Sequence, residues 1–459
     1  MLQVHSPSTG VLLGELVEDD PSSVNRAAQR ARDAQRDWAS NGLAHRSEVL
    51  RRCAALLEGR VDALASLLSA EVGKPFGQAR GEVAGTIARL EFFLEHAPAA
   101  LAPEVAREEP GLSERVTHDP LGLVANISAW NYPYFVSTNV LFPALLAGNA
   151  VLFKPSELAA LSGLEMTALL HEAGVPDGVL QALIGGPRVG AAVLAQPLDA
   201  VFFTGSAATG GRVAAAVAPR AVPLQLELGG KDPAYVCDDV ADLEGAAAAL
   251  ADGAFYNAGQ SCCAVERIYV HEAVAERFIE ALLSRVEGFV VGPPEDPETS
   301  IGPLTRRAQL AVLEAQLADA LAKGARVRCG GRRLEGPGNY FAPTVVTEVD
   351  HGMTLMREES FGPVIGVQVV ASDARAVELM NDTRVGLTAA VYSAEQGRAE
   401  AILGQLDTGS AYWNCCDRVS PYLPWSGRRD SGLGSTLSKD AFRSFTRARA
   451  WHMRSPARA

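Results

Sequence analysis

The sequence predicts an α/β protein that is divided into two α/β domains. The chain has 459 residues, which is more than one hydrophobic core usually holds. From residue 121 onward, short apolar runs alternate with helix-like segments, and a second set of this kind runs from about 235 to 430. Such alternation predicts parallel sheets that are covered by helices on both faces.

Two amphipathic helices are expected before the first sheet. Residues 22–40 repeat apolar side chains at helical spacing, and Ser22 or Ser23 is a suitable N-cap. Residues 46–71 show the same spacing, and Cys53 falls on their apolar stripe, where a thiol is expected to be inert core.

The strands are expected at short apolar runs that turn residues bound. In the first set these runs are LGLVANIS, NAVLFKPS, LQALIGG, DAVFFTGS and VPLQLELGG, with a helix at ALSGLEMTALLHEAG. In the second set the expected strands include ERIYVH, ARVRCGG and LTAAVYS, with a helix at AVAERFIEALLSRV.

Composition excludes several classes of function. Hydrophobic residues make up 48% of the chain and charged residues 21%, as in soluble globular enzymes. No apolar run approaches the roughly 18 residues that span a bilayer, and the N-terminal residues lack the features of a signal peptide. The formal net charge of −13 argues against a nucleic-acid partner, because phosphate contact needs a clustered positive face.

The seven cysteines argue for a reducing compartment, and we expect the cytoplasm. They are odd in number and scattered, so they do not form a recognisable disulfide framework. No C-x-x-C pair occurs, and no histidine lies at ligand spacing from a cysteine, so we expect no metal site.

Two segments have the features of a nucleotide site at the ends of strands. In FFTGSAATGGRVAAAVA, a strand is expected to end at Thr204, Gly205 and Ser206 form a turn, and Gly210 is expected to open a helix whose free N–H groups favour an anion. In VLFKPSE, Lys154 and the glutamate three residues later can hydrogen-bond hydroxyl groups at a strand end. Taken alone, the first segment is better explained as a simple turn, and the second as a solvated strand end.

Two further polar residues lie at positions suited to catalysis. Glu227 lies in the apolar run QLELGGKDP, where desolvation of an unpaired carboxylate would make it a base near neutral pH. Asn131 lies in SAWNYPYF, where aromatic residues and a proline would hold its amide as a rigid donor to an oxyanion. A satisfied carboxylate and ordinary turn chemistry are the alternatives.

The stretch NAGQSCCAVER contains two adjacent cysteines, Cys262 and Cys263. It connects the helix-like run DLEGAAAALADGAFYNAG to the strand ERIYV, and nucleophiles usually lie in such loops on rigid scaffolds. Spacing alone does not decide which thiol is the nucleophile, or whether the pair is inert.

Taken together, these segments resemble the aldehyde dehydrogenase superfamily, in its NAD(P)-dependent, CoA-independent branch. The resemblance covers nearly the whole chain and rests on the following segments, in the order of the family: SPSTG, EVGKP, AWNYP, AGNAVLFKPSE, EAGVPDGV, FTGS, ELGGKDP, GQSCCAVER, IGPLTRR, EESFGPV, NDTRVGLTAAV and SGRRDSGLG.

The resemblance implies a mechanism that begins at Cys262, the second residue after Gly-Gln. Its thiolate attacks the aldehyde carbon to give a thiohemiacetal, and the Asn131 amide with the Cys262 N–H holds the oxyanion. After hydride transfer, Glu227 activates the water that hydrolyses the thioester to a carboxylic acid. Cys263 then lines the pocket or packs behind it.

For the cofactor, the resemblance implies NAD, with NADP as an alternative. Lys154 and Glu157, in a Lys-Pro-Ser-Glu run that contains Ser156, would bind the adenosine ribose. Gly205, Ser206 and the helix near Gly210 would face the pyrophosphate. Glu359 would hold the nicotinamide ribose, and Phe361 would lie against the ring. A carboxylate at Glu157 would repel a 2′-phosphate, which favours NAD.

The chain departs from the family in one respect. Many members have a Trp-Lys pair where this chain has Asn139 and Val140, and an acidic residue where it has Ser435 and Thr436. In such members the lysine and the acid are thought to pair and to help protons leave the site. The departure puts only that relay in doubt.

The substrate pocket is implied to include Tyr132, Tyr256, Cys263, Arg418 and Trp425. The tyrosines, the tryptophan and a further Tyr422 suit an aliphatic or aromatic aldehyde. Arg418 would instead bind the carboxylate of a semialdehyde, unless it is an exposed residue of the pocket mouth or a subunit contact.

The resemblance also implies domain boundaries and a homodimer or homotetramer. A Rossmann-like NAD(P)-binding domain would take residues 1–101 and 121–229, and a catalytic domain residues 230–430. Residues 102–120 and 446–459 would form a small β arm that adds strands to a neighbouring subunit. The alternatives for function are a semialdehyde dehydrogenase and a CoA-acylating enzyme, and Glu227 argues against the latter.

Overall fold

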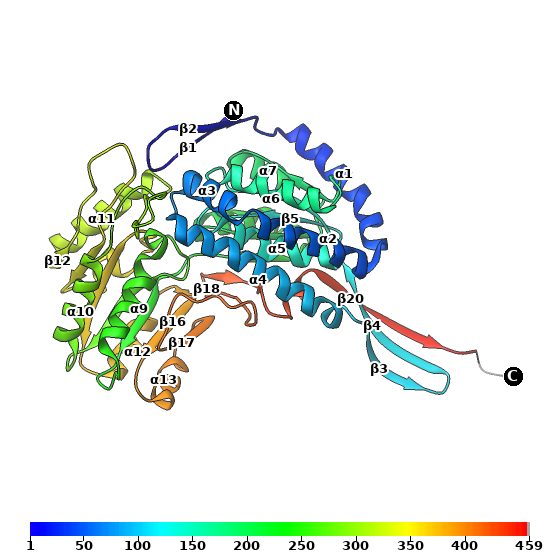
Figure 1. Cartoon of the computed structure of the whole chain (residues 1–459). Helices are drawn as coiled ribbons and strands as arrows, with labels where there is room; N and C mark the ends of the chain where they lie inside the picture. Colours follow the sequence, from blue (N-terminus) through cyan, green and yellow to red (C-terminus); the bar gives the residue numbers. More distant parts are fainter. Residues whose placement is uncertain (457–459) are drawn as a thin grey trace.

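The computed structural model describes residues 1–456 and contains two large sheets and a three-stranded arm (Figure 1). The first large sheet has the strand order β19-β9-β8-β5-β6-β7 and the second β12-β13-β14-β11-β10-β16-β17. The strands are parallel except for β19 and β12. The predicted α/β class with parallel sheets is confirmed.

The N-terminal region is a hairpin followed by helices. Its elements are β1 (Leu2–His5), β2 (Leu12–Leu16), α1 (Pro21–Ser40), α2 (Gly42–Gly59), α3 (Val61–Val72) and α4 (Phe76–Ala100). The N-cap of α1 is Asp20, which accepts from the Ser23 N–H at 2.7 Å, so the predicted serine cap is wrong. The predicted helix 46–71 is two helices, because Gly59 favours a break and Arg60 leaves the helical conformation.

The first sheet positions its polar residues at one edge. Its elements are β5 (Leu123–Ile127), α5 (Pro133–Ala147), β6 (Ala150–Lys154), α6 (Ala160–Ala173), β7 (Leu180–Ala182), α7 (Pro187–Leu194), β8 (Ala200–Thr204), α8 (Ala207–Val217), β9 (Leu224–Glu227) and β19 (Gly432–Leu433). The strand order reverses at β5, which lies between β6 and β8. Open parallel sheets bind ligands at the carboxyl ends of strands at such a reversal.

The second sheet carries the cysteine pair just before one of its central strands. Its elements are β10 (Asp232–Val236), α9 (Leu243–Phe255), the 3₁₀ turn η1 (Tyr256–Gly259), β11 (Val265–His271), α10 (Ala275–Glu287), α11 (Ala308–Ala322), β12 (Arg326–Cys329), β13 (Thr344–Thr347), η2 (Thr354–Met356), β14 (Val364–Val370), α12 (Asp373–Asn381), β16 (Thr388–Tyr392), α13 (Gln396–Leu403) and β17 (Ser410–Trp413). The short strands β15 (Val385–Gly386) and β18 (Arg428–Arg429) pair beside it, and α14 (Ala441–Ser444) precedes the last strand.

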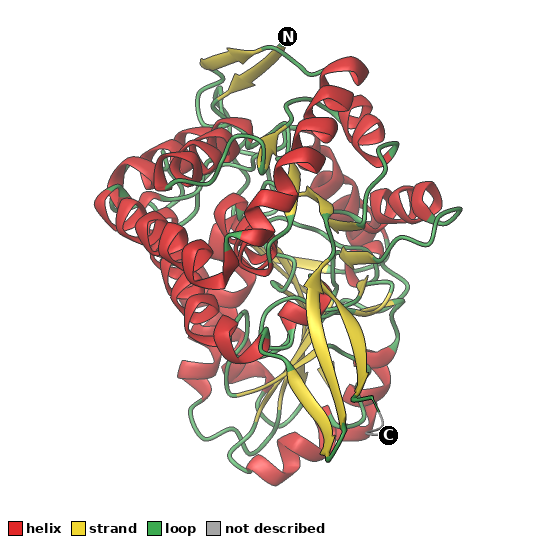
Figure 2. Cartoon of the chain, turned by 90° about the vertical axis from the view of Figure 1, so that its right-hand side faces the viewer, coloured by secondary structure: helices red, strands yellow, loops and turns green. Residues whose placement is uncertain are grey.

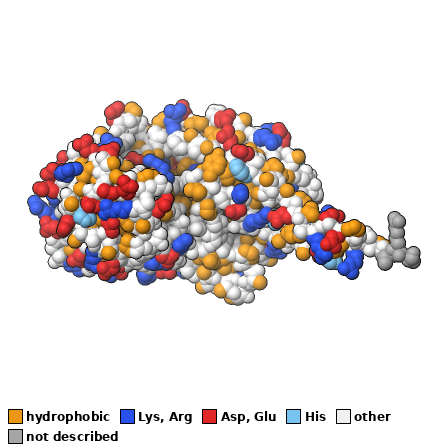
Figure 3. All heavy atoms as spheres, turned by 90° about the horizontal axis from the view of Figure 1, so that it is seen from below, with side chains coloured by type: hydrophobic (Ala, Val, Ile, Leu, Met, Phe, Trp, Pro, Cys, Tyr) orange, Lys and Arg blue, Asp and Glu red, His pale blue; other side chains and the backbone are white. Residues whose placement is uncertain are grey.

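The arm consists of β3 (Glu104–Glu109), β4 (Leu112–Pro120) and β20 (Thr446–Arg454). β4 and β20 pair along their whole length, from Thr446 opposite Pro120 to Arg454 opposite Leu112. Figures 1 and 2 show these strands side by side, and Figure 3 shows the arm projecting from the body. These strands lie within residues 102–120 and 446–456 of the expected arm, and positions 457–459 lie outside the described residues.

Each large sheet has its own hydrophobic core, which is the packing expected of two α/β units. Cys53 is fully buried in the first core, and burial raises the pKa of its thiol to about 12, as an inert core cysteine requires. Among residues 1–456, no helix is both long enough and apolar enough to cross a membrane.

Candidate active site

A cavity of about 680 Å³ collects most of the residues that the sequence singled out. It is lined from the carboxyl edge of the first sheet and from the loop before β11 in the second. The predicted residues that line it are Asn131, Tyr132, Gly205, Ser206, Glu227, Tyr256, Cys262, Cys263, Glu359, Phe361, Arg418 and Trp425. Lys154, Ser156, Glu157 and Gly210 do not line it.

The loop that carries the cysteines is held in an unusual backbone conformation. Asn257, Ala258 and Gly259 all have positive φ, at 53°, 55° and 71°. A Cβ at Gly259 would clash with the carbonyl oxygen of Gly362, so this position requires glycine. The Gln260 side chain accepts from the Thr305 N–H at 2.9 Å and donates to the Asn257 carbonyl at 3.1 Å. Strain of this kind persists only where surrounding contacts hold it, as at functional sites.

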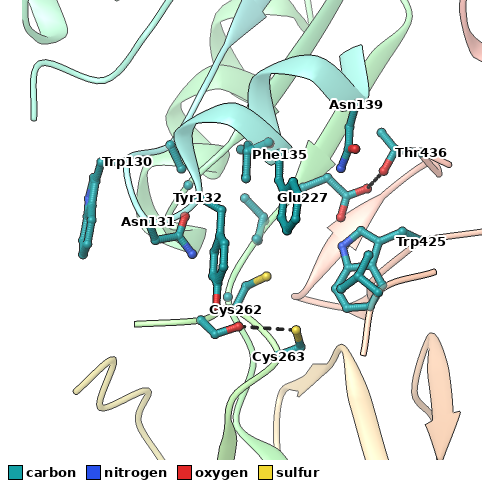
Figure 4. Close-up of a pocket in the computed structure, with 18 of the residues that line it drawn as sticks. Trp130, Asn131, Tyr132, Phe135, Asn139, Glu227, Cys262, Cys263, Trp425 and Thr436 are labelled. Atoms are coloured by element: carbon teal, nitrogen blue, oxygen red, sulfur yellow. Dashed lines mark hydrogen bonds between the residues drawn. The ribbon is translucent and has the colours of Figure 1, made fainter. Parts of the chain in front are cut away.

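The two cysteines have different surroundings. Cys262 is half-buried and faces the cavity, whereas Cys263 is buried and its thiol donates to Asp417 Oδ1 at 3.0 Å. Its contact with Cys262, burial and the nearby Asp417 carboxylate hold the pKa of Cys263 well above the usual value. In Figure 4 the Cys262 sulfur lies near Asn131 and Tyr132, whereas that of Cys263 ends a dashed hydrogen bond. The surroundings of Cys263 therefore disfavour the reactive thiolate at that position.

Asn131 is held through hydrogen bonds to its backbone carbonyl, so its side-chain amide remains free to bind a ligand. Its carbonyl accepts from Lys74 Nζ at 2.9 Å and from Asn257 Nδ2 at 3.0 Å. Asn257 thereby joins the asparagine loop to the cysteine loop. Within residues 1–456, neither the Asn131 amide nor the Cys262 N–H donates to another protein group. Both donors remain available to an oxyanion in the cavity.

Lys74 is a supporting residue that sequence reasoning missed. Its side chain is fully buried and ion-paired with Glu82, whose other oxygen accepts from the Tyr134 N–H at 2.9 Å. This pair ties α4 to the start of α5 beside Asn131. The lysine in the motif EVGKP could have drawn attention to this position, but only the packed structure shows that its ion-pair partner is Glu82.

Glu227 ends β9 in an apolar environment. Its Oε2 is buried and has no hydrogen-bond partner among the described residues, whereas Oε1 accepts a hydrogen bond from Thr436 Oγ1 at 3.4 Å. Burial raises the pKa of Glu227 to about 8. Figure 4 shows Asn139, Glu227 and Thr436 on one side of the cavity, so the two positions that depart from the family come together here. The Gln225 side chain, also sealed and unpaired, lines the same region and was missed from the sequence.

The start of α8 differs from the prediction. The helix begins at Ala207 with Ser206 as N-cap, and Gly210 lies in its first turn rather than opening it. A Cβ at Gly210 would lie 2.6 Å from a Leu228 methyl group, so this glycine allows the helix to approach the sheet. The Ser206 hydroxyl donates to Thr209 Oγ1 instead of capping α8, so the helix begins at the cavity lining without a side-chain cap.

Lys154, Ser156 and Glu157 lie at the carboxyl end of β6, beside β5. Lys154 Nζ lies 3.4 Å from Glu157 Oε2 and donates to the Pro155 carbonyl at 3.0 Å. The Ser156 hydroxyl accepts from the Leu158 N–H at 3.2 Å. The lysine is buried and the Glu157 side chain is 39% exposed, so the carboxylate is accessible to a ligand outside the cavity.

Glu359 and Phe361 line the cavity from the loop between η2 and β14. Glu359 accepts from the Gly230 N–H at 3.2 Å, and burial raises its pKa to about 8. Phe361 has a φ of 47°, and its N–H donates to Glu266, which is also ion-paired with Lys231 at 2.5 Å. Sequence reasoning missed this supporting pair inside the motifs ELGGKDP and GQSCCAVER.

These features fit a dinucleotide cofactor. An uncapped helix N-terminus suits a pyrophosphate, and the Lys154–Glu157 pair at the neighbouring strand end suits ribose hydroxyls. The Phe361 and Trp130 rings pack edge to face, with centroids 5.5 Å apart and an interplanar angle of 81°, and both line the cavity.

The remaining predicted pocket residues divide between the cavity and its mouth. Tyr132, Tyr256 and Trp425 line the cavity, and the Trp425 backbone pairs with Thr436 at 2.7 and 2.9 Å. Arg418 lines the cavity but is exposed. Tyr422 is 66% exposed and packs edge-on against Phe92 at 4.9 Å, outside the cavity lining.

Comparison with known proteins places these residues in a family. The model of the aldehyde dehydrogenase family matches residues 1–451. A chloroplastic betaine aldehyde dehydrogenase from Amaranthus hypochondriacus is 36% identical over 450 residues, which cover 95% of this chain and 90% of that protein. The NADP(+) succinate-semialdehyde dehydrogenase of Deinococcus radiodurans is 36% identical over 442 residues, 96% of this chain and 92% of its own. A solved indole-3-acetaldehyde dehydrogenase in complex with NAD+ has a TM-score of 0.95 at 32% identity, covering 99% of this chain and 93% of that one.

Proposed function

This chain belongs to the aldehyde dehydrogenase family, and we propose that it oxidises an aldehyde to a carboxylic acid through Cys262, without CoA. It is an oxidoreductase that uses NAD(P), as its relatives do. One observation carries the proposal. The half-buried Cys262 thiol and the desolvated Glu227 carboxylate line one cavity, together with Asn131. The Asn131 amide and the Cys262 N–H are both available as donors to an oxyanion.

The chemistry divides into two steps, each with its own residues. The Cys262 thiolate forms a carbon–sulfur bond with the aldehyde, and the oxyanion accepts hydrogen bonds from the Asn131 amide and the Cys262 N–H. When bound, NAD(P) accepts the hydride of the aldehyde carbon. Loss of the hydride leaves the acyl group bound to Cys262 as a thioester. Glu227 then takes a proton from the water that attacks the thioester carbonyl. The products are the carboxylic acid and the free thiol.

The cofactor is proposed to lie across the carboxyl edge of the first sheet. Lys154 and Glu157 would bind the adenosine ribose, and the Ser206 end of α8 would face the pyrophosphate. Glu359 would hold the nicotinamide ribose, and Phe361 would lie against the ring. The accessible Glu157 carboxylate would repel a 2′-phosphate, so NAD is the preferred cofactor.

The test is cofactor reduction by a panel of aldehydes in the absence of CoA. We expect NADH to form at 340 nm with at least one aldehyde, and kcat/KM to be higher with NAD than with NADP. A strict requirement for CoA would favour the acylating alternative. A higher kcat/KM with NADP would contradict only the preference, and no reduction of either cofactor by any aldehyde would contradict the function.

The arm is proposed to pair with a second copy of the chain as a dimer or tetramer. β3 and β20 are the edges of the arm sheet, and every residue of β3 is exposed. Exposed strand edges are templates for pairing with another chain. Light scattering at micromolar concentration should give two or four times the 48.4 kDa chain mass, and a monomer would contradict the proposal.

A cytoplasmic location is proposed as well, because all seven cysteines are free. Cell fractionation would check it, and recovery from an oxidising compartment would contradict it.

A further inference from the structure

One buried cation in the cavity has no part in the mechanism above. Arg89 lies on α4, is 5% exposed and lines the cavity. No group within residues 1–456 accepts a hydrogen bond from its guanidinium, and its Nε is sealed without a partner. Burial lowers the pKa of Arg89 to about 10, so the side chain remains charged at neutral pH.

Two of the carboxylates that line the cavity, Glu82 and Asp417, already accept hydrogen bonds from other groups. Glu82 accepts from Lys74 through one oxygen and from the N–H groups at the start of α5 through the other. Asp417 Oδ1 accepts from Ser261 at 3.1 Å and from Cys263 at 3.0 Å. Arg89 therefore has no ion-pair partner among the residues that the structure describes.

An aromatic stack holds the guanidinium in place. Its central carbon lies 3.5 Å from the centre of the Phe135 ring, which stacks on Tyr132 at 5.8 Å with an interplanar angle of 7°. Lys74 Nζ also contacts Tyr132, 3.6 Å from the ring centre. A cation–π contact stabilises the charge but uses none of the five N–H donors. Figure 4 shows Tyr132 and Phe135 within the pocket.

The helix also makes room for this arrangement. Gln78, Glu82, Gly85 and Arg89 recur at a spacing of three or four residues, and all four line the cavity. A Cβ at Gly85 would lie 2.6 Å from Phe135 Cζ, so only a glycine here leaves room for the Phe135 ring to pack against the Arg89 guanidinium.

An unpaired buried charge is costly unless a ligand pairs with it. We propose that Arg89 binds an anionic group of the substrate, and that the substrate is an aldehyde carrying a carboxylate. This inference rests on the proposed function. A carboxylate matches the planar fork of a guanidinium and can accept two hydrogen bonds from it. The same charge disfavours a cationic aldehyde, although relatives named for betaine aldehyde are as similar to this chain as the succinate-semialdehyde one.

Arg89 takes the role that the sequence considered for Arg418. Arg418 is exposed, as is Arg306, the third arginine that lines the cavity. Water screens an exposed charge, so neither one provides the desolvated contact that gives specificity.

The experiment compares two aldehydes of four carbons, succinate semialdehyde and butanal, with betaine aldehyde as the cationic counterpart. We expect the wild-type enzyme to have at least about tenfold higher kcat/KM for the anionic aldehyde than for butanal. Arg89→Met keeps an unbranched side chain but removes the charge. It should lower kcat/KM for succinate semialdehyde by about 10- to 100-fold, mainly through KM, and change butanal less than threefold.

Arg418→Met is the matched control, and it should change the ratio of the two aldehydes less than threefold. Equal losses with both aldehydes in Arg89→Met would assign Arg89 a structural role and overturn the proposal. A wild-type preference for butanal or betaine aldehyde, or loss of the anion preference only in Arg418→Met, would also overturn it.

A binding measurement separates this inference from the proposed function. Succinate titrated calorimetrically into the wild-type protein should bind at least about tenfold more tightly than butyramide, and Arg89→Met should remove the difference. If no aldehyde reduces the cofactor but succinate still binds through Arg89, the proposed function fails and the anion site stands. If butanal is oxidised but succinate binding does not depend on Arg89, the anion site is overturned and the proposed function stands.

Discussion

Replacing Cys262 by serine is expected to lower aldehyde oxidation by roughly 10⁴-fold or more. Serine keeps the size and polarity of the site, but its hydroxyl is a much weaker nucleophile than a thiolate. The readout is NADH formation under saturating aldehyde and NAD. Unfolding temperature should stay within a few degrees of wild type, which would show that the loss is chemical.

The chain provides its own matched control in the adjacent residue. Cys263→Ser preserves a donor to Asp417 and should keep activity within about tenfold of wild type. Iodoacetamide should alkylate Cys262 first, and aldehyde with NAD should protect it, because Cys263 is buried and its pKa is held high. Alkylation of Cys263, or full activity in Cys262→Ser, would show that Cys262 is not the nucleophile.

Replacing Glu227 by glutamine is expected to lower kcat by about 10²- to 10⁴-fold, because the water that hydrolyses the thioester loses its base. Hydride transfer precedes this step, so a rapid burst approaching one NADH per active site should remain. The trapped acyl group should be visible on Cys262 by mass spectrometry. A variant without the burst would place Glu227 before hydride transfer and contradict its assigned step.

The same residue predicts how activity depends on pH. Burial raises the pKa of Glu227 to about 8, so below that pH it is protonated and cannot accept a proton. The rate of thioester hydrolysis should therefore rise from pH 6 to about 8 and level off above it. The hydrogen bond from Thr436 favours the ionised form, so Thr436→Val should shift this rise to higher pH. A pH-independent hydrolysis rate in the wild type would contradict the assignment.

Much of the fold could be predicted from the sequence because its signals are local. Apolar runs bounded by turns located β5 to β9 of the first sheet and β11, β12 and β16 of the second, whereas the arm was expected from the resemblance. The errors concerned helix ends, where neighbouring residues compete to cap or to break a helix and the hydrophobic pattern does not decide between them. Asp20 displaced a serine as N-cap, and Arg60 left the helical conformation between two helices that share one apolar stripe.

The sequence by itself determined which residue types lie at the strand ends and in the cysteine loop, because the order of the motifs along the chain does not depend on how the chain packs. It thereby determined the family and brought Cys262, Glu227 and Asn131 forward as candidates. Tertiary structure alone decided their environments. Desolvation of Glu227, the isolation of Cys263 beside Asp417 and the unpaired charge of Arg89 arise where α4, α5 and the two sheets meet. Burial and charge pairing depend on neighbours far apart in the chain, and no spacing within one segment records them.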